Sequence, residues 1–133
     1  MASMLWDSTL VTGHTRMDAD HVELAGLFDL LREAVEQSKG KEFCGMVLDQ
    51  IIEYAGKHFD LEQQLMAKHR YPGMEVHTAE HAMLLAQVLE YRGAFDALAA
   101  APKIALIDFP DVWLGFHILF SDKDLALFLA RTR

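Results

Sequence analysis

Histidines and carboxylates at helical spacing are the residues of this sequence that could do chemistry. His77 and His81 are four residues apart in HTAEH, and His58 and Glu62 are four apart in HFDLE. Side chains at i and i+4 lie on one face of a helix, so each pair could bind one metal ion or an adjacent pair of ions. HTAEH also matches the H-x-x-E-H of inverted zinc proteases, with Glu80 as the general base. That alternative is disfavoured, because no strand to bind a peptide is visible and three further histidines would be unexplained.

Four amphipathic helices are predicted to position these residues, because apolar side chains recur at steps of three and four along most of the chain. The motifs SKGK and RYPG interrupt the pattern between helices. Asp18 and Asp20 offer carboxylates to the N-terminal end of the first helix, where the helix dipole favours them. The expected helices cover residues 18–38, 41–69, 73–99 and 104–130, after a leader at residues 1–17.

The helical pattern predicts the fold class. Strand alternation is nowhere sustained, and four helices with short connections favour an all-α fold, an antiparallel up-down four-helix bundle with an N-terminal leader segment. Pro110 interrupts the last pattern, so the last helix either begins near Pro110 or is kinked there. The length of 133 residues suits one domain, and we expect residues 1–133 to form it.

Five of the seven histidines are expected to face the core of this bundle. Four of them lie on the same stripes as the leucines: His21, His58, His77 and His81. The fifth, His117, follows Trp113 by one helical turn. Buried imidazoles without partners would cost a few kcal/mol each, against a net stability of roughly 5 to 15 kcal/mol for a small domain. A bound metal would remove that cost, because each neutral imidazole can donate a lone pair to it.

The number of ligands favours two metal ions. Five imidazoles and the carboxylate of Glu62 are too many for one tetrahedral zinc, and they suit two five- or six-coordinate ions. Two irons are therefore the leading hypothesis for the cofactor. His14 and His69 lie outside this ligand set, and we expect them at the surface or at its boundary.

Composition excludes several classes of partner. Twelve Lys and Arg against twenty Asp and Glu give a net charge of −8, which repels nucleic acid and anionic lipid. The single cysteine, Cys44, cannot form an internal disulfide, and the first residues, MASMLWDSTL, do not read as a signal peptide. No stretch approaches the roughly 20 apolar residues that span a bilayer. We expect a monomeric cytoplasmic protein that binds neither nucleic acid nor membrane.

Five blocks of the sequence resemble the single-domain bacterial hemerythrins, in order and in spacing, over nearly the whole chain. The blocks are LWD, TGHTRMDADH, HFDLEQQLM, YPGMEVHTAEH and WLGFHILFSDKDL. The resemblance implies a four-helix bundle around two nonheme iron ions, bridged by an oxo or hydroxo group, that binds dioxygen reversibly.

The resemblance also implies a role for individual residues. One iron would be bound by His77, His81 and His117, and the other by His21 and His58, which leaves the second iron a position for dioxygen. Two carboxylates would bridge the irons, those of Glu62 and Asp122. The dioxygen pocket would be lined by Phe59, Trp113, Leu114 and Ile118, although ordinary core packing accounts for these four equally well.

Asp122 is the one ligand that helical spacing would not select. It follows His117 by five residues, which turns an ideal helix by about 140°, whereas Asp124 at seven residues returns to nearly the same side. Resemblance alone selects Asp122. If it is right, either the helix is distorted near Ser121 or the two side chains flank the metal pair from opposite sides. Gln63 stands where many relatives have a second glutamate, and we interpret it as a surface change.

The favoured function is dioxygen binding for carriage, storage or sensing, without turnover of a substrate. A histidine-rich site should favour binding over oxidation, because neutral imidazoles add no negative charge to stabilise higher oxidation states. One alternative is a di-iron redox enzyme that acts on peroxide or nitric oxide. Another is an iron or zinc handling protein, which would hold labile metal and do no oxygen chemistry.

Overall fold

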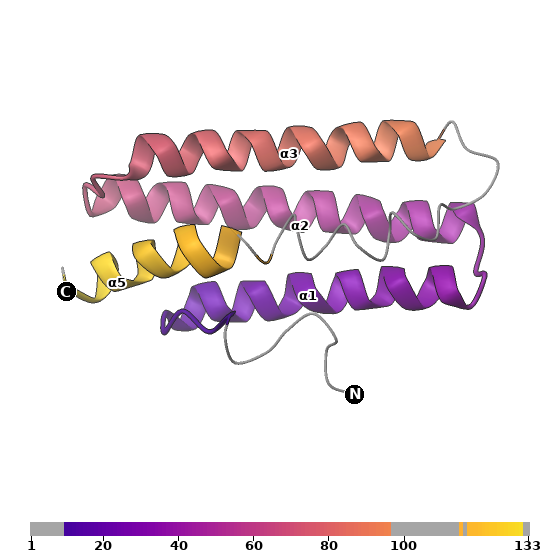
Figure 1. Cartoon of the computed structure of the whole chain (residues 1–133), viewed down its shortest axis with the longest axis horizontal. Helices are drawn as coiled ribbons and strands as arrows, with labels where there is room; N and C mark the ends of the chain where they lie inside the picture. The colour runs from indigo at the N-terminus through magenta and orange to yellow at the C-terminus, as the bar shows by residue number, and fades with distance from the viewer. Residues whose placement is uncertain (1–9, 97–114, 116, 132–133) are drawn as a thin grey trace.

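The helices of the computed structural model stack as an antiparallel bundle (Figure 1), described over residues 10–96, 115 and 117–131. Helix α1 (Thr15–Glu36) is followed by α2 (Lys41–Lys68) and α3 (Met74–Asp96). A π-helix, η3 (His117–Asp122), continues directly into α5 (Lys123–Arg131) and supplies the fourth helical segment. The all-α four-helix fold is confirmed, and no strand occurs in these ranges.

The first helix begins at Thr15 rather than at residue 18, so the predicted leader is too long by three residues. His14 caps this helix, because its Nδ1 accepts the backbone N–H of Met17 at 3.2 Å. Asp18 lies in the first turn, as expected, and accepts hydrogen bonds from the backbone N–H and the hydroxyl of Thr12, at 2.8 and 2.7 Å. That carboxylate holds the preceding segment against the start of α1.

The remaining boundaries follow the expected breakers. Between α1 and α2, Ser38 and Gly40 have φ of 54° and 97°, a left-handed geometry that ends one helix and lets the next begin. The turn before α3 needs Gly73, because a Cβ there would come within 2.9 Å of the Tyr71 ring. Residues 97–99 and 104–114 of the expected third and fourth helices, including Pro110, lie outside the described residues.

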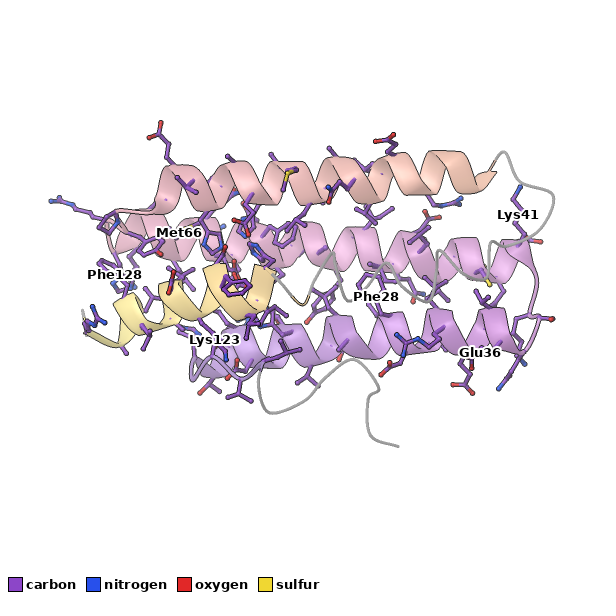
Figure 2. The ribbon with its side chains drawn as sticks, viewed as in Figure 1. Phe28, Glu36, Lys41, Met66, Lys123 and Phe128 are labelled. Carbon is purple, nitrogen blue, oxygen red and sulfur yellow. The ribbon has the colours of Figure 1, made fainter. Side chains whose placement is uncertain are left out.

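The core has two apolar clusters separated by a polar layer. The larger cluster includes Leu24, Phe28 and Phe59, and the smaller contains Met17, Met66, Leu125 and Leu129. In Figure 2, Met66 and Phe128 lie at one end of the bundle, opposite Glu36 and Lys41. The histidines occur in sequence between members of the two clusters, so apolar packing lies on both sides of them.

The predicted buried stripe of the first helix is confirmed, since its members are at most 2% exposed: His21, Leu24, Phe28, Leu31 and Val35. None of the described helices combines the length and the apolar character that crossing a membrane requires.

Candidate metal centre

Seven polar side chains from all four helical segments meet in the layer between the apolar clusters. Each is at most 3% exposed: His21, His58, Glu62, His77, His81, His117 and Asp122. These are the seven residues that the sequence singled out as ligands. Since such groups are rarely buried without partners, their convergence in one layer marks the candidate site.

The seven side chains form two overlapping groups whose ligand atoms lie within 4.8 Å of one another. One group has three histidines, His77, His81 and His117, and the other has two, His21 and His58. Glu62 and Asp122 belong to both groups. The division into three and two histidines around two shared carboxylates is the one that the resemblance implies.

Glu62 directs one oxygen toward each group. Its Oε1 lies 3.0 Å from Nε2 of His77 and 2.9 Å from Nε2 of His81. Its Oε2 lies 2.5 Å from Nε2 of His58, one turn back on α2, and 3.7 Å from Nε2 of His21. A carboxylate with this orientation is suited to bridging two metal ions.

The two carboxylate oxygens of Asp122 also point toward different groups of histidines. Its Oδ2 lies 2.9 Å from Nε2 of His21, and its Oδ1 lies 3.0 Å from Nε2 of both His77 and His117. The π-helix makes this possible, because i to i+5 hydrogen bonding brings Asp122 back over His117. Asp124, the residue that ideal helical spacing favoured, is exposed. Of the two explanations open to the sequence, helix distortion is therefore the correct one.

The donor atoms fit a metal ion. All five histidines present Nε2 to the carboxylates. Four buried atoms in this layer lie close to an oppositely charged partner but have no hydrogen bond of good geometry: Glu62 Oε2, His117 Nε2, Asp122 Oδ1 and Asp122 Oδ2. Buried carboxylates need a cation nearby. Imidazole nitrogens and carboxylate oxygens together suit iron or zinc.

Without metal, protons would supply the compensating charge. Burial alone would lower the pKa of His21 and His77, but hydrogen bonds and charge from Asp122 and Glu62 raise both pKa values to about 9. Burial would raise the pKa of Glu62, yet hydrogen bonds from four histidines hold it well below its ordinary value. The pKa of Asp122 is also lowered, chiefly by His117 and His21, against its burial and the charge of Glu62. In the metal-free protein, Glu62 and Asp122 therefore stay ionised, and His21 and His77 bind protons more readily than an ordinary histidine.

Two further carboxylates hold the outer nitrogens of the histidines. Nδ1 of His58 lies 2.8 Å from Asp20 Oδ2, and Nδ1 of His117 lies 2.5 Å from Glu80 Oε1. A carboxylate can only accept here, so Nδ1 donates and the lone pair of a neutral ring stays on Nε2. Ser121 also donates to Glu80 Oε1, at 2.7 Å. The outer carboxylates thus fix the tautomer that metal binding requires.

Sequence reasoning missed these outer roles. Asp20 was expected to interact with the helix dipole, and Glu80 entered only as the base of a protease motif. Glu80 lies three residues after His77 on the inward side of α3, which is the one signal that could have suggested its role. Gln63 was interpreted as a surface residue, but it is half-buried, with Nε2 3.5 Å from Nδ1 of His81. Gln63 therefore lies at the boundary of the site, partly exposed and within reach of His81.

The expected pocket residues are partly described. Phe59 is 2% exposed and stacks on His81, with ring centroids 4.1 Å apart and planes inclined by 12°. Ile118, next to His117, is fully buried. Trp113 and Leu114 lie outside the described residues. Neither of the two half-buried histidines expected outside the ligand set, His14 and His69, belongs to the metal-binding groups.

Comparison with known proteins places these features in a family context. Residues 12–127 match the model of the hemerythrin HHE cation binding domain. A bacteriohemerythrin of Stenotrophomonas maltophilia (strain R551-3) is 30% identical over 126 residues, which are 95% of this chain and 81% of that protein. A bacteriohemerythrin of Pseudomonas paraeruginosa (strain PA7) is 30% identical over 97 residues, 73% of this chain and 63% of that protein. A crystal structure of wild-type hemerythrin superposes with a TM-score of 0.85 at 26% identity, covering 97% of this chain and 99% of that one.

Proposed function

This chain belongs to the hemerythrin family, and we propose that it binds dioxygen reversibly at a nonheme di-iron centre, for oxygen carriage, storage or sensing. The observation that carries the proposal is the orientation of Glu62 and Asp122, each with one oxygen toward the group of three histidines and the other toward the group of two. Two ions held side by side by shared carboxylates are what a di-iron centre needs.

The ligand assignment follows these groups. We propose that His77, His81 and His117 bind one iron and that His21 and His58 bind the other, with Glu62 and Asp122 bridging them. The group with two histidines offers one ligand fewer, so dioxygen would bind on its side. When bound, an oxo- or hydroxo-bridged iron pair supplies the reversible redox chemistry that dioxygen binding requires.

The residues of the chain favour binding over oxidation of a substrate. The five imidazoles are neutral when they act as ligands, so only two carboxylates contribute negative charge. Asp20 and Glu80 orient two of the rings and keep their lone pairs on Nε2. Phe59 and Ile118, both buried, would exclude water from the bound gas. We assign Trp113 and Leu114 to the same pocket on the strength of the family resemblance.

We further propose that the chain acts as a single domain and as a monomer in the cytoplasm, without enzymatic turnover. The family match over residues 12–127 supports the single domain. The lone cysteine, Cys44, is buried, and burial raises its pKa, which suits an unreactive core thiol rather than a redox centre.

Visible absorption of the iron-reconstituted protein tests the proposal. Spectra are recorded for the ferrous protein under nitrogen, then in air, then after a second nitrogen purge, together with the iron content per chain. New bands that appear in air at two irons per chain and vanish on purging support reversible binding. Bands that never reverse would instead indicate a redox enzyme, and an absence of bands at full metal loading would indicate metal handling.

A further inference from the structure

A chain of hydrogen bonds connects His58 to the surface between α1 and α2. Asp20 on α1 accepts from Nδ1 of His58 at 2.8 Å through Oδ2, and from the hydroxyl of Tyr54 at 3.0 Å through Oδ1. Tyr54 precedes His58 by one turn on α2. Its half-buried ring lines a surface pocket together with Glu23, Gln50, Glu53 and Lys57. One carboxylate therefore joins a surface tyrosine to a proposed metal ligand.

Tyr54 is the main partner of the outer oxygen of Asp20. Within the described part of the chain, the other donor near this oxygen is Arg16, whose Nε lies 3.8 Å from Oδ1 and whose side chain is 67% exposed, so solvent screens its charge. Burial, then the bond to Asp20 and the charges of Asp20 and Glu23, raise the pKa of Tyr54 to about 12. The phenol is thus a neutral donor at any physiological pH, and Asp20 remains the acceptor.

The two outer carboxylates are arranged differently. On Glu80, a single oxygen accepts from both His117 and Ser121. On Asp20, His58 and Tyr54 bind opposite oxygens. The Asp20 arrangement serves the group with two histidines, on whose side dioxygen is proposed to bind. Any change in the acceptor strength of Asp20 would reach the metal through His58, a member of that group.

A carboxylate that accepts from Nδ1–H makes the imidazole a stronger donor through Nε2. A second donor on the same carboxylate weakens this effect. It stabilises the negative charge of the carboxylate, which then accepts less strongly from Nδ1–H of His58. We propose that Tyr54 is a positioning residue that acts through Asp20 to moderate electron donation by His58 and so tunes the reduction potential of the metal it binds. The identity of that metal as iron rests on the proposed function, whereas the coupling of Tyr54 to His58 does not.

Two substitutions that should shift the reduction potential in opposite directions test this proposal. Tyr54→Phe removes only the hydroxyl, so His58 should donate more strongly, the reduction potential of the iron protein should fall, and autoxidation should accelerate by about threefold to tenfold. Asp20→Asn keeps a hydrogen-bond acceptor for His58 but removes the charge, so the potential should rise and autoxidation should slow. A merely structural role would move both variants in the same direction.

A second measurement on the same variants does not depend on iron. In the protein loaded with diamagnetic zinc, the Nδ1–H proton of His58 should move downfield in Tyr54→Phe and upfield in Asp20→Asn, as seen by nitrogen-proton NMR. The control is Tyr71→Phe, since the Tyr71 hydroxyl has no hydrogen bond within the described residues, and the proton should then stay in place. Circular dichroism checks that each variant is folded.

The double variant decides whether Tyr54 acts through Asp20. Without the charge of Asp20, removal of the hydroxyl should add nothing, so Tyr54→Phe with Asp20→Asn should match Asp20→Asn alone. The inference would be overturned if the effects of the two substitutions on the reduction potential were additive, or if both single variants shifted the potential in the same direction. It would also be overturned if the Nδ1–H proton of His58 did not move in Tyr54→Phe. If the zinc-loaded protein behaves as expected but the iron protein does not bind dioxygen, the proposed function fails while the coupling stands.

Discussion

His117 and Asp122 are five residues apart, yet Nε2 of His117 and Oδ1 of Asp122 lie 3.0 Å from each other. An ideal α-helix would point the two side chains about 140° apart. The π-helix over His117–Asp122, which continues into α5, reduces that difference because it has more residues per turn than an α-helix. The distortion lies in the layer of metal-binding residues, where it brings the carboxylate of Asp122 close to both groups of histidines.

The first prediction concerns this carboxylate. Asp122→Ala should weaken metal binding by roughly 100-fold or more, because loss of a direct ligand should exceed the 10- to 100-fold cost of losing an outer partner. Asp124→Ala should bind metal normally, because Asp124 is exposed and outside both groups. Competition with a chelator measures the affinities. The reverse order would show that helical spacing, rather than the π-helix, selects the ligand.

The second prediction concerns the outer carboxylate of the three-histidine group. Glu80→Gln keeps the shape of the side chain but removes the charge that Nδ1 of His117 contacts, so we expect a 10- to 100-fold loss of metal affinity. Glu75→Gln is the control, since Glu75 lies on the same helix and is exposed. Equal metal affinities for the two variants would mean that Glu80 does not support His117.

The third prediction is a pH dependence of the metal-free protein. His21 and His77 have pKa values of about 9 in the folded state, against 6.5 for an ordinary histidine, so the folded state binds more protons between these values. Their contribution, on the order of a few kcal/mol, is complete below pH 6.5 and is lost as pH rises through 9. Thermal unfolding of the metal-free protein at several pH values from 6 to 9.5 should show a falling melting temperature.

Metal binding should depend on pH in the opposite direction. The same imidazoles must lose their protons to act as ligands, so metal affinity should rise between pH 6.5 and 9. The difference in melting temperature between loaded and metal-free protein should therefore widen over this range. A difference that narrows would mean that His21 and His77 carry no extra proton in the metal-free state.

The fourth prediction concerns the apolar wall. Ile118→Ala should shorten the lifetime of the dioxygen-bound protein, because a cavity beside His117 admits water, and should also cost about 2 to 5 kcal/mol of stability. Leu48→Ala is matched in burial but lies ten residues before His58 on α2, about 15 Å along the helix axis. It should lose comparable stability while the lifetime is unchanged. Similar lifetimes in both variants would remove Ile118 from the pocket.

The sequence alone determined the features that depend on neighbours along one helix. The stripe from His21 to Val35, and the pairs His58 with Glu62 and His77 with His81, follow from a period near 3.6 residues and were predicted without tertiary information. The burial of five histidines followed from the same periodicity. Local backbone geometry fixes these relationships, so the order of residues is enough to find them.

Only the tertiary structure decided the features that depend on contacts between helices or on a departure from ideal geometry. Asp20 and Glu80 became partners of His58 and His117 because α1 packs on α2, and α3 packs against η3. Asp122 enters the metal layer only because the backbone adopts i to i+5 hydrogen bonds, which periodicity does not reveal. Hydrogen bonds between distant parts of the chain select Asp20 and Glu80, and a local departure from α-helical geometry selects Asp122.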